Sequence, residues 1–137
     1  MTLAELDCIL HFVAAQGRPI PVPTRLSYHS DDPYAVHIAF HMADQDPVSW
    51  VFARDLLAAG TARPSGHGDV RIRPGVAEQS ESLLLELSPH RRRALFTMPA
   101  AVVKPWIEQT YRLVPAGFEG ASLDLDSEVS RLLGEVA

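Results

Sequence analysis

The stretch YAVHIAFHM, residues 34–42, alternates apolar and smaller or polar side chains over nine positions. One face would carry Tyr34, Val36, Ile38, Phe40 and Met42, and the other Ala35, His37, Ala39 and His41. A period of two is typical of a half-buried strand. The polar run ADQDP (43–47) and the alternating run VSWVFA (48–53) follow directly. Two such runs joined by a short polar loop predict a β-hairpin.

The hydrophobic period changes at RDLLAAG, residues 54–60, which predicts a short helix after the hairpin. Asp55 is expected to cap this helix or to lie in its first turn, where free N–H groups favour a carboxylate. Gly60 is expected to take the left-handed position that ends a helix. Arg54 is expected to pair locally or at a subunit contact. We therefore interpret Arg54 and Asp55 as residues that stabilise the fold rather than as catalytic residues.

The flanking sequence predicts further strands and two C-terminal helices. The expected strands cover residues 3–14, 24–29, 69–74, 82–88 and 93–98, with the proline-rich stretch RPIPVP (18–23) as an extended connection. The expected helices cover 99–115, where Pro105 marks a kink or the true start, and 123–136, capped by Asp124 or Asp126. Hairpins followed by helices indicate one α+β domain over residues 1–137, with an antiparallel sheet, a short inserted helix and two C-terminal helices.

Composition and charge exclude several classes of protein. The net charge of −5 argues against a protein whose main task is to hold phosphate backbones. Cys8 is the only cysteine, which excludes an internal disulfide and a multi-thiolate metal site and suits a reducing cytoplasm. The apolar stretch 9–15 contains His11 and is too short to span a bilayer, so we expect no direct membrane insertion.

Neither the histidines nor the serines form a recognisable reactive set. His37 and His41 would lie roughly 13 Å apart on one strand, too far to share a metal ion. The glycine loop SGHGD (65–69) lacks the Lys-Ser/Thr of a phosphate-binding loop and precedes a strand rather than a helix. Cys8 is expected to be a small buried hydrophobe. We therefore predict no catalytic residue, no metal and no cofactor.

Arginines leave a second hypothesis open. Arg71 and Arg73 would share one strand face, with Arg63 and the run Arg91-Arg92-Arg93 nearby in sequence. Such a face can hold single-stranded nucleic acid. No aromatic residues interleave with these arginines to stack bases, so nucleic-acid binding is the less favoured alternative.

Three motifs resemble the SsgA-like family of sporulating actinobacteria, closest to its SsgB branch. They are DPYAVHIAFH (32–41), WVFARDLLAAG (50–60) and RPSGHGDVR (63–71), and the resemblance extends over nearly the whole chain. The family motif places structural or interface residues at Asp32, Tyr34, Trp50, Arg54, Asp55, Gly60, Gly66, Gly68 and Asp69.

The resemblance implies a non-enzymatic regulator of sporulation-specific cell division in the cytoplasm, at division septa. It implies recruitment or positioning of the tubulin-like protein FtsZ and an SsgA-type sister protein as a second partner. It also implies a homo-oligomer, a trimer, with a fold similar to whirly-type single-stranded nucleic-acid binders.

Overall fold

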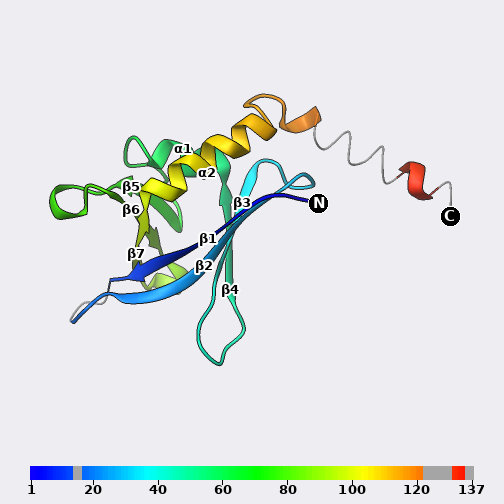
Figure 1. The fold of residues 1–137 in the computed structure, drawn as a ribbon. Helices are drawn as coiled ribbons and strands as arrows, with labels where there is room; N and C mark the ends of the chain where they lie inside the picture. Colours follow the sequence, from blue (N-terminus) through cyan, green and yellow to red (C-terminus); the bar gives the residue numbers. More distant parts are fainter. Residues whose placement is uncertain (14–16, 122–130, 135–137) are drawn as a thin grey trace.

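In the part of the chain that the structure describes, seven strands form one antiparallel sheet in the order β4-β3-β2-β1-β7-β6-β5 (Figure 1). The computed structural model describes residues 1–13, 17–121 and 131–134. The strands are β1 Thr2–Phe12, β2 Ile20–His29, β3 Ala35–Phe40, β4 Val48–Ala53, β5 Val70–Pro74, β6 Ser82–Leu87 and β7 Ala94–Pro99. The helices are α1 Arg54–Gly60 and α2 Ala100–Leu113, with short 3₁₀ turns at Ala77–Gln79 and Pro89–Arg91. This arrangement confirms the predicted α+β class.

The sheet consists of two meanders that meet between β1 and β7. Strands β1 to β4 follow one another outward to one edge, and β5 to β7 return from the other edge to pair with β1. Helix α1 joins the two edge strands and contacts β3, β4 and β5. Helix α2 contacts β1, β6, β7 and α1. The sheet is therefore curled, with both helices packed on its inner face (Figure 1).

The predicted hairpin at residues 34–53 is confirmed. Strands β3 and β4 pair antiparallel with Ile38 opposite Trp50. Val36, Ile38 and Phe40 are buried, as the alternation predicts. Tyr34 and Met42 lie just outside the strand and are exposed, so the buried face is shorter than the sequence pattern.

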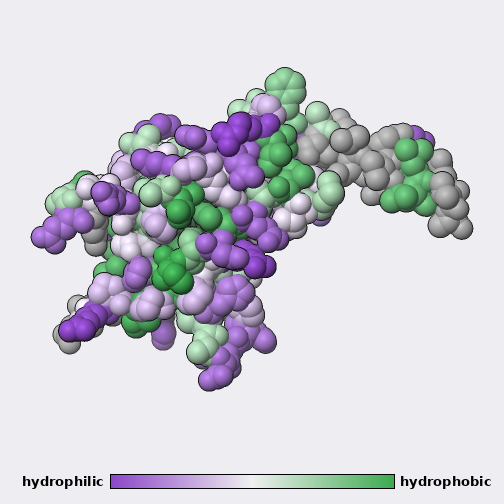
Figure 2. Space-filling view, viewed as in Figure 1, coloured by the Kyte–Doolittle hydropathy of each residue, from purple (hydrophilic) through white to green (hydrophobic). Residues whose placement is uncertain are grey.

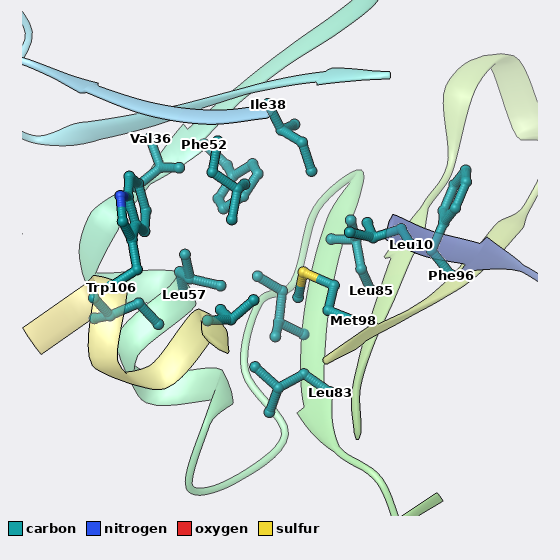
Figure 3. Close-up of a cluster of buried hydrophobic side chains, with 14 of the residues drawn as sticks. Leu10, Val36, Ile38, Phe52, Leu57, Leu83, Leu85, Phe96, Met98 and Trp106 are labelled. Carbon is teal, nitrogen blue, oxygen red and sulfur yellow. The ribbon is translucent and has the colours of Figure 1, made fainter. Parts of the chain in front are cut away.

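The core fills the space between the inner sheet face and the two helices (Figure 3). Trp106 of α2 and Leu57 of α1 lie close to Val36 and Phe52 in this view. Further along the sheet, Leu10, Leu83, Leu85, Phe96 and Met98 complete the cluster. Residues 83–87 of β6 are all buried, and β6 has a neighbouring strand, β5 or β7, on each side.

The proline-rich stretch before residue 24 belongs to β2, which corrects its assignment as a connection. Strand β2 begins at Ile20 and carries Pro21 and Pro23 opposite His11 and Ile9 of β1. Strand β3 pairs only with Thr24–Ser27, so this half of β2 has a strand neighbour on one side. Proline lacks an N–H donor and is accepted on such an edge.

Helix α2 runs from Ala100 to Leu113 with Pro105 inside it, so Pro105 is not the true start of the helix. The predicted apolar face of α2 is confirmed, because Val103, Trp106, Ile107 and Val114 are buried and Tyr111 is partly buried.

Most of the second predicted helix, including its expected caps Asp124 and Asp126, lies outside the described residues; residues 131–134 are helical. Among the described residues no helix is long and apolar enough to cross a membrane.

Gly60 has a different role from the one predicted. It is the last residue of α1 and does not take a left-handed conformation; the residue that follows the helix, Thr61, has φ −72°. A Cβ atom at Gly60 would lie 2.4 Å from Cγ2 and 2.6 Å from Cβ of Ile72. The absence of a side chain therefore lets α1 approach β5 closely.

Replacing Gly60 by alanine is expected to lower the free energy of unfolding by about 1–3 kcal/mol, because the added methyl group overpacks against the buried Ile72. Thermal and urea unfolding would measure the loss. Gly68→Ala is the matched control, since a Cβ there meets nothing within 4 Å. Equal melting temperatures for Gly60→Ala and the parent chain would contradict the packing role.

Candidate interaction site around a buried arginine

Arg54, the first residue of α1, is buried with 1% of its surface exposed. Its guanidinium carbon lies 3.9 Å from the centre of the Tyr111 ring and 4.9 Å from that of Tyr28. The electron-rich face of an aromatic ring attracts a cation, and the attraction is stronger away from water. The two rings therefore replace part of the hydration that the guanidinium loses.

The same guanidinium completes the C-terminal end of α2. Its Nη1 donates to the carbonyl oxygens of Thr110, at 3.0 Å, and Val114, at 2.8 Å. Carbonyl groups at the C-terminal end of a helix carry partial negative charge, which a cation stabilises, and the Thr110 carbonyl also accepts the Val114 amide at 2.9 Å. Arg54 thus joins the start of one helix to the end of the other.

Glu119 supplies the counter-charge. Its Oε1 accepts from Arg54 Nη2 at 3.0 Å and its Oε2 accepts from the Gly117 amide at 2.9 Å. The amide of Glu119 itself, followed by Arg54 and the Gly117 amide, lowers the pKa of this carboxyl, while burial opposes the shift. Glu119 is therefore ionised and holds the turn after α2 against the arginine.

Asp55 does not cap α1, which corrects the first of its two predicted positions and confirms the second, in the first turn. The residue before the helix is Ala53, which makes no side-chain cap hydrogen bond. Asp55 lies in the first turn and accepts a hydrogen bond from the Tyr111 hydroxyl at 2.5 Å. Burial, followed by this bond, raises the pKa of Tyr111. Arg54 and Asp55 thus both bind α2, and neither pairs locally.

Three other motif residues lie on the β3-β4 hairpin and the turn before it. Asp32 bonds through Oδ2 to His37 Nε2 at 2.9 Å. Tyr34 accepts the Arg54 amide N–H at its carbonyl oxygen, at 2.8 Å, and leaves its ring exposed. Trp50 is partly buried against the core. These residues lie on or just before the hairpin whose second strand, β4, leads directly into α1 at Arg54.

The glycine loop at residues 65–69 is shaped by its contact with β5. Gly66 has φ +100°, and a Cβ atom there would lie 2.4 Å from the Val70 carbonyl oxygen. Gly68 stands in open space, and the Asp69 carbonyl oxygen accepts the Ser88 amide. Of the two loop glycines, Gly66 is the one whose backbone conformation and close neighbours exclude a side chain.

Potential reactive groups are inert or scattered. Burial, followed by the charge of Asp7, raises the pKa of Cys8 to about 11, so the thiol is protonated at neutral pH. Among the described residues no group of three His, Cys, Asp or Glu side chains could hold a metal ion. His37 pairs with Asp32 and packs edge-on against His29.

Large apolar side chains are exposed around the C-terminal end of α2. Leu113 lies in the last turn, and Phe118 follows on the turn that Glu119 anchors, with exposed fractions of 48% and 63%. Tyr34 is 57% exposed, and its hydroxyl lies 4.0 Å from the Cβ position of Gly120. Figure 2 shows hydrophobic residues gathered at this end of α2. We call Tyr34, Leu113 and Phe118 the helix-end patch.

The partners of Arg54 could not be found from local sequence patterns. Tyr28, Tyr111 and Glu119 lie 26 to 65 residues away along the chain. One signal was available: an arginine between the apolar runs WVFA and LLAA must find a buried counter-charge, and Glu119 is an isolated acid in the run AGFEGAS.

The fold and this site define an α+β domain with a buried Arg54–Glu119 ion pair and exposed apolar side chains around the C-terminal end of α2. Residues 22–119 match the family described as Streptomyces sporulation and cell division protein, SsgA. The chain belongs to this SsgA family.

Similar proteins cover almost the whole chain. The sporulation-specific cell division protein SsgB of Streptomyces coelicolor is 41% identical over 95% of this chain and 96% of its own. SsgB of Thermobifida fusca is 40% identical over 90% of both chains. The crystal structure of an SsgA-like sporulation-specific cell division protein from Thermobifida fusca superimposes with a TM-score of 0.81 at 38% identity, covering 93% of this chain and 95% of that one.

Arg54→Met is expected to lower the free energy of unfolding by about 3–5 kcal/mol, because it leaves the Glu119 carboxylate buried without its partner. Urea unfolding followed by circular dichroism would measure this. The exposed Arg112→Met is the control and should change stability by less than about 0.5 kcal/mol. Similar losses in the two variants would contradict a special role for Arg54.

Stability is also expected to depend on pH through Glu119. Its pKa lies below the ordinary 4.5 in the folded protein, so its contribution is present above that value and is lost as the pH falls through the lowered pKa. Glu119→Gln should flatten this acid limb of the stability curve. Asp7→Asn, which removes an exposed partner of Arg25, should flatten it less. Parallel curves for Glu119→Gln and the parent chain would rule out this linkage.

Proposed function

We propose that this protein is a non-enzymatic adaptor for sporulation-specific cell division that brings FtsZ to septum sites. The observation that carries the proposal is the 41% identity to Streptomyces coelicolor SsgB over 95% of the chain, together with the shared fold.

The helix-end patch is our proposed docking surface for FtsZ. Phe118 and Leu113 are large exposed apolar side chains, and aromatic anchors often dominate binding energy at interfaces. Two contacts hold the turn that carries Phe118. The Phe118 N–H donates a hydrogen bond to the Pro115 carbonyl oxygen at 3.0 Å, and the neighbouring Glu119 forms an ion pair with Arg54. A preordered anchor loses less conformational entropy when a partner binds.

We further propose that the protein acts as a homo-oligomer, a trimer, located at division septa in the cytoplasm with an SsgA-type sister protein as a second partner. A trimer would present several equal sites to a polymer. Several weak contacts to one filament then act together, so that the assembly binds more tightly than one subunit. Light scattering of the purified chain would give the mass of the oligomer.

Co-sedimentation with FtsZ filaments tests the recruitment. The purified protein should pellet in a saturable manner with cognate FtsZ and GTP, and should stay in the supernatant when nucleotide is omitted. Leu113→Ser with Phe118→Ser should abolish pelleting, because it removes the apolar contact. Val76→Ser is the control at an exposed valine outside the patch, 76% exposed. Absence of pelleting with the parent protein, with or without an SsgA-type sister protein, would reject recruitment of FtsZ.

A further inference from the structure

A second surface lies at the β5 edge of the sheet, apart from the helix-end patch. A cleft of about 380 Å³ opens between the loop at residues 64–67 and the face of β5 and β6 that points away from the core. Arg71 and Arg73 of β5, Glu86 of β6, and Arg93 just before β7 line it, with His67 on the loop side. The motif RPSGHGDVR (63–71) thus supplies the loop and the first part of the strand that form the cleft.

The loop wall is fixed to the strand. Ser65 and Ile72 exchange two backbone hydrogen bonds, from Ser65 N to Ile72 O at 2.8 Å and from Ile72 N to Ser65 O at 3.0 Å. Gly66 permits the sharp return, since its φ of +100° and its contact with the Val70 carbonyl exclude a side chain. The cleft is therefore preformed.

The charge in the cleft is unbalanced. Glu86 is its one acidic lining residue, is 5% exposed and forms an ion pair with Arg93. Arg71 lies opposite Glu86 in the strand register, yet neither Arg71 nor Arg73 forms an ion pair within the part of the chain that the structure describes. Three guanidinium groups thus face one carboxylate, on a chain whose net charge is −5.

We propose that this cleft binds a carboxylate-rich, extended segment of a protein partner. Arg71 and Arg73 lie two residues apart on one face of β5, which places their Cα atoms roughly 6.6–6.8 Å apart. An extended peptide repeats its side chains on one face at the same interval, so acidic residues at alternate positions match the two arginines. Each guanidinium can donate two parallel hydrogen bonds to one carboxylate, which makes a bidentate pair.

The cleft suits an acidic peptide better than a nucleic acid. Its lining contains no Phe, Tyr or Trp on which bases could stack. The buried Glu86 and the negative charge of the whole chain oppose a long polyanion. Arg71 and Arg73, which form no ion pair among the described residues, can neutralise two carboxylates. A short acidic peptide therefore does not need a continuous row of basic residues along the surface. The proposal does not depend on FtsZ being the partner of the helix-end patch.

Fluorescence anisotropy with labelled probes tests the cleft. The first probe is a peptide of alternating glutamate and serine, the second is the same peptide with glutamine for glutamate, and the third is an oligothymidylate of equal negative charge. The acidic peptide is expected to bind in a saturable manner and more weakly as salt rises, because the contacts are ionic. The glutamine peptide is expected not to bind.

The variant Arg71→Gln with Arg73→Gln should weaken binding of the acidic peptide by about tenfold or more, because two charge-assisted contacts are lost. Arg18→Gln with Arg112→Gln makes the same change in net charge away from the cleft and should leave affinity within about twofold. Arg93 is left unchanged in both, since its loss would leave the buried Glu86 unpaired. Thermal unfolding of both variants verifies that they are folded.

Two sets of results would overturn the proposal. Failure of the acidic peptide to saturate at low salt, or equal affinity in the cleft variant and in the parent chain, would show that the cleft does not bind carboxylates. Tighter binding of the oligothymidylate than of the acidic peptide, lost in the same variant, would assign the cleft to nucleic acid instead.

Discussion

The burial of one guanidinium group organises this domain. Arg54 lies between two tyrosine rings, caps the last carbonyl groups of α2 and pairs with Glu119. These contacts come from β2, from α2 and from the turn after α2, so the β2 strand, both helices and that turn are held at one point. A charge that has left water tolerates little displacement of its partners. The rigid presentation of the helix-end patch follows from this one buried ion pair.

Local patterns were sufficient to predict most of the sheet. The alternation in β3 and β4, and in Val70 to Arg73 of β5, reports directly which side faces the core, because strand geometry repeats every two residues. The start of β2 was missed because Pro21 and Pro23 disfavour strands in general, whereas here β3 ends before it reaches them. Which part of β2 lies beside β3 is set by the strand pairing and cannot be deduced from the residues of β2 alone.

The site was less predictable than the fold for a related reason. The sequence indicated that Arg54 and Asp55 are architectural, but it suggested local partners and a helix cap. The actual partners, Tyr111 and Glu119, come from the far end of the domain. Gly60 shows the same limit: a glycine after two alanines suggests a helix end, and only the position of Ile72 reveals the close approach. Distant contacts override local preference at these positions.

The separation between Arg54 and its partners also has a consequence for how the chain is made. The carbonyl groups and the carboxylate that receive the guanidinium lie 56 to 65 residues further on. At about 5–20 residues per second, a ribosome needs roughly three to thirteen seconds to add that length. During this interval the arginine stays hydrated and the first four strands lack their cover. The buried ion pair can therefore form only late in synthesis, when α2 and the turn that carries Glu119 have been added.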